Sequence, residues 1–200
     1  MRIRRITAAL AAVLTVGALA LAGCSADPLA QQFKEGSGKN YIAGTGVTEV
    51  QADKRDKPVV FEGTTEDGAK VTSSQYRGQV LVVNFWYAGC APCRVEAPDL
   101  QKLSQEYQGK GASFLGVNTH DTAATAKSFE KTYGVTYPSI LDVDSGSVQL
   151  AFSGALSPNA TPTTLVLDKR GRVAARIEGP INDQPSTLDT LISDAIAGRG

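Results

Sequence analysis

The chain has 200 residues with 20 basic and 20 acidic side chains, and 42% of its residues are hydrophobic. This length and composition predict one domain of moderate size in addition to the termini. The formal net charge of zero becomes acidic once the three arginines among the first five residues are set aside, so the charge gives no sign of a nucleic-acid-binding protein. Three cysteines are also too few for the disulfide framework of a small secreted domain.

The first 24 residues have the pattern of an export signal. Residues 1–5 are basic, residues 6–20 are uncharged and apolar, and Leu21-Ala22-Gly23-Cys24 places small residues before a cysteine. This resembles a bacterial lipoprotein signal peptide, so we expect residues 1–23 to be removed and Cys24 to carry a lipid anchor. An uncleaved signal anchor is the less favoured alternative, because the apolar stretch is short for a membrane span. Both interpretations place the rest of the chain outside the cytoplasm.

Residues 24–57 are expected to form a lipid-anchored tether. Residues 25–40 are small and polar, as in a flexible linker. Residues 41–50 contain apolar side chains that a free linker would not need, so we expect this part to be partly ordered against the domain. The domain itself is predicted to occupy residues 58–200.

Strand and helix patterns follow one another along this domain. Residues 59–61 and 69–71 flank the Glu66-Asp67-Gly68 turn signal and predict a β-hairpin. Further strands are expected at 80–85, 113–118, 163–167 and 173–177, and an extended segment at 137–143. Helices are expected at 94–108, 122–133, 147–152 and 189–197. This order predicts an α/β fold in which helices cover both faces of a mixed sheet.

Two cysteines, Cys90 and Cys93, lie between a buried apolar strand and a helix. That placement puts the first thiol at a helix N-terminus, where unpaired N–H groups and the helix dipole stabilise a thiolate. The second cysteine, in the first helical turn, can attack a mixed disulfide formed by the first, which is the chemistry of dithiol–disulfide exchange. An inert disulfide is the less favoured alternative. A zinc site is disfavoured because the domain offers only His120 as a further soft or borderline ligand.

The order of these elements, with Thr161-Pro162 far beyond the cysteines, resembles the thioredoxin-like fold. Cys90-Ala91-Pro92-Cys93-Arg94-Val95-Glu96-Ala97-Pro98 is similar to the Cys-x-Pro-Cys-x-x-Glu-x-Pro pattern of the TlpA/ResA-like family of membrane-tethered thiol–disulfide oxidoreductases. Residues 122–152 also resemble the insertion typical of that family. With its lipoprotein signal, the chain looks most like the lipoprotein members found in actinobacteria.

The resemblance implies roles for three residues around the cysteine pair. Cys90 would be the attacking nucleophile, as thiol chemistry alone also predicts, and Cys93 would be the resolving thiol. Glu96 would be an acid/base group that takes the proton when Cys93 becomes a nucleophile. Its alternative role is that of a first-turn glutamate that interacts favourably with the helix dipole.

The resemblance also implies a substrate-binding surface. Pro162 matches the cis-proline of the family, and the backbone of Thr161 before it would pair with an extended substrate segment, with Trp86 nearby. Two residues depart from the family pattern. Asn84 stands where thioredoxins commonly have a buried acid, and Gly89 stands where the family usually has an aromatic residue before the first cysteine.

These observations predict an extracytoplasmic, lipid-anchored, monomeric enzyme that exchanges protein thiols and disulfides without a bound cofactor or metal ion. The reductive direction is favoured because Ala91-Pro92 lacks the histidine of strongly oxidising relatives. The resemblance implies a membrane thiol-transfer protein as electron donor, and a role in cytochrome c maturation or envelope thiol homeostasis. One alternative is a peroxiredoxin-like peroxidase, although this chain lacks the threonine expected shortly before the peroxidatic cysteine, here Cys90. The other alternative is a non-enzymatic lipoprotein that binds Cu(I).

Overall fold

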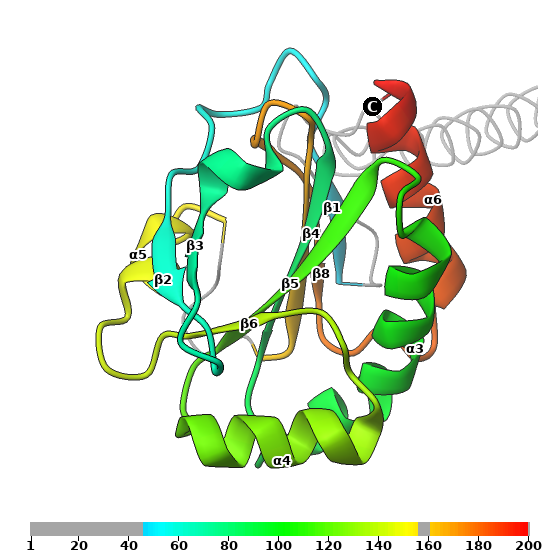
Figure 1. The fold of residues 1–200 in the computed structure, drawn as a ribbon. Helices are drawn as coiled ribbons and strands as arrows, with labels where there is room; N and C mark the ends of the chain where they lie inside the picture. Colours follow the sequence, from blue (N-terminus) through cyan, green and yellow to red (C-terminus); the bar gives the residue numbers. More distant parts are fainter. Residues whose placement is uncertain (1–45, 156–160, 200) are drawn as a thin grey trace, which may run out of the picture. The chain divides into compact units, whose positions relative to one another are not determined.

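The computed structural model describes residues 46–155 and 161–199 (Figure 1). The expected signal peptide, the lipid-anchored Cys24 and the tether up to residue 45 lie outside the described residues. Among the helices of the described ranges, none combines the length and the apolar character needed to cross a bilayer.

A six-stranded mixed sheet forms the centre of the domain, and it confirms the predicted α/β fold. Its order is β1-β8-β7-β4-β5-β6, with β4 parallel to β5 and β5 parallel to β6, whereas the β1–β8, β8–β7 and β7–β4 pairs are antiparallel. The seven residues of the central strand β4 are all buried, as expected for a strand covered on both faces. The strands are β1 (Val47–Glu49), β4 (Val80–Trp86), β5 (Ala112–Asn118), β6 (Ser139–Leu141), β7 (Thr163–Leu167) and β8 (Val173–Glu178).

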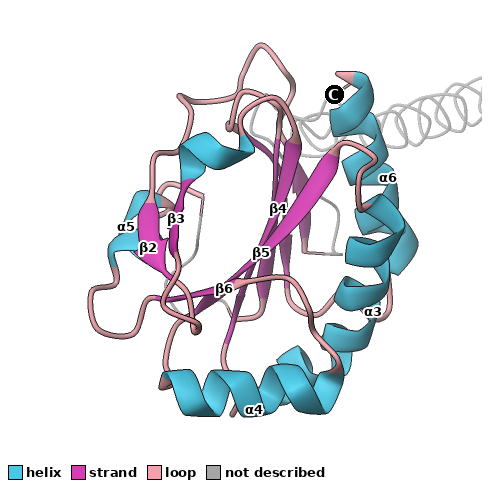
Figure 2. Ribbon diagram, in the orientation of Figure 1, coloured by secondary structure: helices cyan, strands magenta, loops and turns pink. Residues whose placement is uncertain are grey.

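Different elements cover the two faces of this sheet (Figure 2). On one face α3 (Ala91–Tyr107) and α6 (Pro185–Ala197) bury Leu100 and Leu188 against β4 and β7. On the other face lie a hairpin of β2 (Glu62–Thr64) and β3 (Lys70–Thr72), the 3₁₀ helix η2 (Ser73–Tyr76) and the short helix α5 (Ser147–Ala151). The helix α4 (Ala123–Tyr133) lies at the end of the sheet where α3 begins (Figure 1).

The hairpin lies later in the chain than predicted. The sequence predicts its first strand at residues 59–61, but the structure has it at Glu62–Thr64, paired with Lys70–Thr72. Val59 instead donates its N–H to the carbonyl of Gly171 at 2.9 Å. The ring of Phe61 packs 5.6 Å from that of Phe152 in the core. These distant contacts override the local strand propensity of the two residues.

The folded domain begins before residue 58, which is its predicted first residue. Strand β1 pairs antiparallel with β8, with Val47 opposite Ile177. Both side chains are buried in the core beneath α6. The apolar character of residues 47–50, noted in the sequence, therefore corresponds to an edge strand of the main sheet.

Gly116 in β5 lies in a confined position between two neighbouring side chains. A Cβ at this residue would overlap Ser139 Oγ and lie 2.8 Å from Trp86 Nε1, closer than ordinary van der Waals contact. Ser139 belongs to β6 and Trp86 to β4, so both neighbours are held in strands that pair directly with β5. Only a residue without a side chain fits between them.

We therefore expect Gly116→Ala to lower the free energy of unfolding by roughly 1–3 kcal/mol, the usual cost of overpacking a core. Gly154→Ala is the matched control, because its added Cβ would meet no atom within 4 Å. Urea denaturation of both variants and the parent measures the effect. Equal unfolding midpoints for Gly116→Ala and the parent would contradict this description of the strand contacts.

Candidate active site

Cys90 and Cys93 form a disulfide at the start of α3. Cys90 is the N-cap residue of the helix, and its Sγ accepts a hydrogen bond of 3.1 Å from the backbone N–H of Cys93. In this oxidised form the two residues are almost equally buried, with 4% of Cys90 and 2% of Cys93 exposed. Exposure therefore hardly distinguishes the two cysteines in this form. The stronger distinction is that helix N–H donors and the positive end of the dipole face Cys90.

The loop before Cys90 is held by two side chains that the sequence analysis did not identify. Asp121 accepts a hydrogen bond of 2.6 Å from the N–H of Ala88, and Arg94 donates one of 3.0 Å to the carbonyl of the same residue. Asn118, the last residue of β5, also donates to Asp121 at 2.8 Å. Because β4 and β5 are parallel, their carboxyl ends meet at one edge of the sheet. This rule makes a polar residue just after β5 a candidate for the site beside the end of β4.

Trp86 lies beneath the cysteine pair. Only 4% of the residue is exposed, and its ring packs on that of Phe129 in α4, with 4.3 Å between the ring centroids. Both cysteines belong to the same apolar cluster as these two rings. In the disulfide form the buried Trp86 therefore packs in the same cluster as the cysteine pair, on its interior side. The next residue, Tyr87, packs on the ring of His120, with 4.5 Å between the ring centroids.

Glu96 is completely buried one helical turn behind Cys93. Residues three apart on a helix share a face, so its carboxyl group lies on the side of α3 that carries Cys93. Burial raises the pKa of Glu96 to about 7, although the two hydrogen bonds that it accepts act in the opposite direction. A carboxyl group of this pKa can both accept and release a proton near neutral pH.

Two donors hold the two oxygens of Glu96. Asn84 Nδ2 in β4 donates to Oε1 at 2.8 Å, and the backbone N–H of Ile181, just before α6, donates to Oε2 at 3.0 Å. Asn84 Nδ2 also lies 3.1 Å from Thr164 Oγ1 in β7. The asparagine that departs from the thioredoxin pattern therefore has a definite partner, which is the buried glutamate of the neighbouring helix.

The Thr161–Pro162 peptide bond is cis. In the sheet register Thr163 lies opposite Phe85, so Thr161-Pro162 lies at the same end of the sheet as Trp86 and the cysteine loop. The carbonyl of Pro162 accepts a hydrogen bond of 2.9 Å from Gly179. Of the residues predicted to contact substrate, Pro162 is buried, whereas Thr161 remains partly exposed.

Within residues 46–155 and 161–199, no group of three or more histidine, cysteine, aspartate or glutamate side chains is placed to hold a metal ion.

The raised pKa of Glu96 predicts a pH-dependent stability. The carboxyl group ionises near 4.5 in the unfolded chain and near 7 in the folded protein, so unfolding releases a proton between these values and stability falls as pH rises. We expect the parent to lose roughly 3 kcal/mol of unfolding free energy between pH 4.5 and 7 relative to Glu96→Gln. Denaturant titrations across this range measure the difference. Parallel pH profiles for the two proteins would exclude a raised pKa at Glu96.

Comparison with known proteins agrees with this architecture. The Redoxin family matches residues 43–192. A thiol-disulfide oxidoreductase ResA of Bacillus cereus is 29% identical over 119 residues, which are 60% of this chain and 66% of the relative. ResA of Bacillus subtilis is 28% identical over 124 residues, 62% of this chain and 65% of the relative. The match thus spans slightly less than two thirds of the length of these relatives.

Solved structures of similar proteins share the fold more completely. A DsbF homologue from Corynebacterium diphtheriae is 30% identical, with a TM-score of 0.67, and the match covers 77% of this chain and 96% of that one. A secreted thiol-disulfide isomerase from Corynebacterium glutamicum is 28% identical, with a TM-score of 0.66 and coverage of 79% and 97%. These relatives confirm the predicted resemblance to ResA-like proteins. The family match takes in every strand from β1 to β8 and the disulfide at the start of α3, and shows that the chain belongs to the Redoxin family.

Proposed function

We propose that this protein is a thiol–disulfide oxidoreductase that acts on protein substrates through Cys90 and Cys93. The observation that carries the proposal is the disulfide at the N-cap of α3, where the N–H of Cys93 points at Cys90 Sγ. The same donor and the helix dipole would stabilise a Cys90 thiolate after reduction of the pair. The kinship with ResA supports the same activity.

In the reductive direction the reaction has two exchange steps. The Cys90 thiolate attacks one sulfur of a substrate disulfide, so that a mixed disulfide forms and one substrate thiolate leaves. Cys93 then loses its proton and attacks Cys90 Sγ, which forms the intramolecular disulfide and releases the second substrate thiolate. Two electrons pass from the cysteine pair to the substrate, and two protons appear on the substrate thiols. The pair itself carries the electrons, so the scheme requires no bound cofactor.

Glu96 is the proposed proton acceptor for the second step. The face of α3 that it shares with Cys93, its burial and its pKa near 7 suit a group that takes the proton of a thiol within the protein. Its bonds from Asn84 and Ile181 would stabilise the carboxylate once the proton has been released to solvent. Glu96 would thereby adjust the rate at which Cys93 resolves the mixed disulfide.

Location and direction complete the proposal. The signal pattern before Cys24 supports an extracytoplasmic protein anchored by lipid, which we expect to be monomeric, and the C. glutamicum relative is described as secreted. We favour reduction of substrates, with a membrane thiol-transfer protein as donor, because Ala91-Pro92 lacks the histidine of strongly oxidising proteins. Cytochrome c maturation or envelope thiol homeostasis would be the process served.

Substitution of each cysteine tests the exchange scheme. Cys90→Ser is expected to abolish reduction of insulin by dithiothreitol above the uncatalysed rate. Cys93→Ser should trap mixed disulfides through Cys90, visible as reducible adducts by mass spectrometry. Cys24→Ser is the control, because it removes the third cysteine without touching the pair. Full activity in Cys90→Ser would exclude the scheme, and rapid consumption of hydroperoxide or retention of Cu(I) without exchange would favour one of the two alternatives.

The proton-transfer role of Glu96 predicts a change in the pH dependence of exchange. In the parent, release of the mixed disulfide should accelerate as Glu96 ionises around pH 7, and this inflection should be absent in Glu96→Gln. Glu130→Gln is a matched control, since burial also raises the pKa of Glu130 to about 7 but the residue lies in α4 and outside the proposed chemistry. Stopped-flow measurement with a fluorescent disulfide gives the profiles. The same profile in Glu96→Gln and the parent would leave Glu96 with a structural role only.

A further inference from the structure

One edge of the central sheet is only half paired, although side chains largely bury its unpaired half, where Ala112 and Phe114 are each 5% exposed. Strand β6 pairs with residues 116–118 of β5, so the first four residues of β5, from Ala112 to Leu115, have no neighbouring strand on that side. The ladder stops at Pro138, whose carbonyl accepts the N–H of Gly116 at 2.9 Å. Proline has no N–H of its own, so it cannot bond to the next carbonyl of β5.

The direction of the known bonds identifies the groups on the open edge. The N–H of Gly116 points towards β6, whereas the carbonyl of Gly111 points to the other side and accepts from Val80 in β4. Because backbone groups alternate along a strand, the N–H and C=O of Ala112 and Phe114 face the open edge. In the part of the chain that the structure describes, these four groups have no hydrogen-bond partner.

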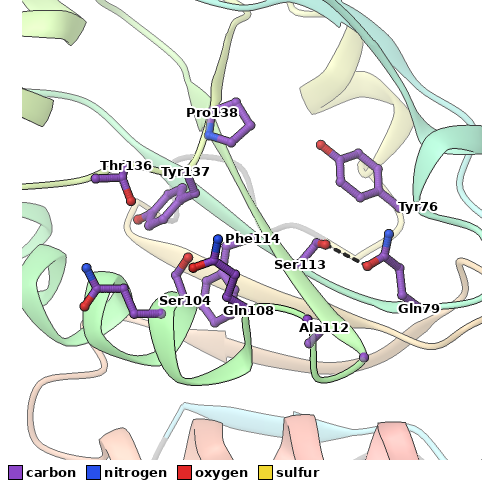
Figure 3. A pocket seen from close by; sticks show the side chains of 13 residues that line it. Tyr76, Gln79, Ser104, Gln108, Ala112, Ser113, Phe114, Thr136, Tyr137 and Pro138 are labelled. Carbon is purple, nitrogen blue, oxygen red and sulfur yellow. Dashed lines mark hydrogen bonds between the residues drawn. The ribbon is translucent and has the colours of Figure 1, made fainter.

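A cavity of about 390 Å³ lies along this edge (Figure 3). Its volume falls within the roughly 300–1,000 Å³ of typical ligand sites. No charged side chain lines it, and its aromatic, amide and hydroxyl groups include those of Tyr76, Gln79, Gln108, Ser113, Phe114 and Tyr137.

The cavity extends over both faces of the sheet. Phe114 and Tyr137 lie on the face covered by α3, with ring centroids 5.9 Å apart. On the other side of β5, Ser113 donates to Gln79 Oε1 at 2.8 Å, near Tyr76 (Figure 3). A strand added to the open edge would send alternate side chains to these two faces, so each would meet one half of the lining.

We propose that this edge binds an extended, uncharged peptide segment of a partner protein by strand addition. The free N–H and C=O groups of Ala112 and Phe114 supply the main-chain bonds, and the two halves of the cavity receive alternate side chains. A charged side chain would be desolvated here without a counter-ion, which excludes acidic or basic segments. A sugar would suit the aromatic and amide lining, but would leave the strand-spaced main-chain groups unused.

This peptide site is separate from the cysteine pair. The cysteines follow the carboxyl end of β4, whereas the open edge begins at the opposite end of the parallel strand β5, about 20 Å away by the rise of a strand. Binding at this edge is therefore independent of the thiol chemistry, and an inactive cysteine pair would leave it intact.

Nuclear magnetic resonance titration of the full ¹⁵N-labelled chain, in its disulfide form, tests the site. The probe is the capped peptide acetyl-Thr-Val-Gln-Val-Thr-amide. We expect saturable shifts and slower hydrogen exchange at the amides of Ala112 and Phe114, without comparable shifts at Cys90 or Cys93. No saturable binding of this peptide, or binding centred on the cysteine loop, would overturn the proposal.

Two methylated peptides distinguish strand addition from recognition of side chains. One carries N-methyl groups on residues 2 and 4, and the other on residues 1, 3 and 5. Only one set of peptide N–H groups can face the protein edge, so one analogue should bind at least tenfold more weakly than the other. Equal affinity of the two analogues, or binding of a chitin oligosaccharide at Ala112 and Phe114 in preference to the peptide, would contradict strand addition.

A variant of the protein tests the main-chain hydrogen bonds by removing a donor from the protein instead of from the peptide. Ala112→Pro removes one N–H of the open edge and leaves the ladder with β4 intact, because proline is accepted where the N–H faces away from a neighbouring strand. We expect at least tenfold weaker peptide binding, with Lys169→Pro in an exposed turn as the control that retains it. Unchanged affinity in folded Ala112→Pro would overturn the proposal, and the methylated peptides remain a test if that variant does not fold.

Discussion

The buried carboxyl group of Glu96 connects the elements that position the cysteine pair. It extends from α3 and is held by Asn84 of β4 at one oxygen and by the backbone of Ile181 at the other. Leaving any of these groups unpaired in the core would cost on the order of 1–3 kcal/mol, so the three segments are constrained together. Since Cys90 is the N-cap of α3, this contact also fixes the direction in which the helix N-terminus meets the end of β4. The placement of the thiols thus depends on a polar contact one helical turn behind them.

The sequence predicts local elements well because their signals are local. The apolar run of β4, the cysteine spacing and the helical pattern after it are each contained in a short window, and the structure confirms all three. The role of Glu96 is predicted only through the family resemblance, because the two groups that donate to its carboxyl oxygens lie 12 and 85 residues away in the sequence. The bond from Ala88 to Asp121 spans 33 residues and was missed for the same reason. The shifted hairpin has a similar cause, because the contact of Phe61 with the distant Phe152 outweighs the local strand propensity of Phe61.

The two ends of the parallel strands have different chemistry because of the way the sheet is terminated. At the carboxyl ends, loops and helices bring Asp121, Arg94 and α4 against the cysteine loop and cover its polar groups. At the amino end of β5, Pro138 stops the ladder and the short β6 leaves main-chain groups unpaired. Edge strands with free backbone groups are usually short or protected, because they otherwise pair with other chains. This edge runs only from Ala112 to Leu115, which limits it to a brief extended segment.

Asn84 shows why the departure from the thioredoxin pattern is consistent with a working site. Two carboxyl groups within hydrogen-bond distance cannot both ionise, and one of them would be forced to keep its proton well above neutral pH. An asparagine at this position donates to Glu96 and adds no second charge, so a single carboxyl group titrates near neutral pH one helical turn after the resolving cysteine. Compared with the thioredoxin pattern, the buried acid lies on the helix that carries both thiols instead of on the strand. Its distance from Cys93 is then set by the geometry of one helix rather than by the packing of a helix on a sheet, which makes it less sensitive to changes elsewhere in the core.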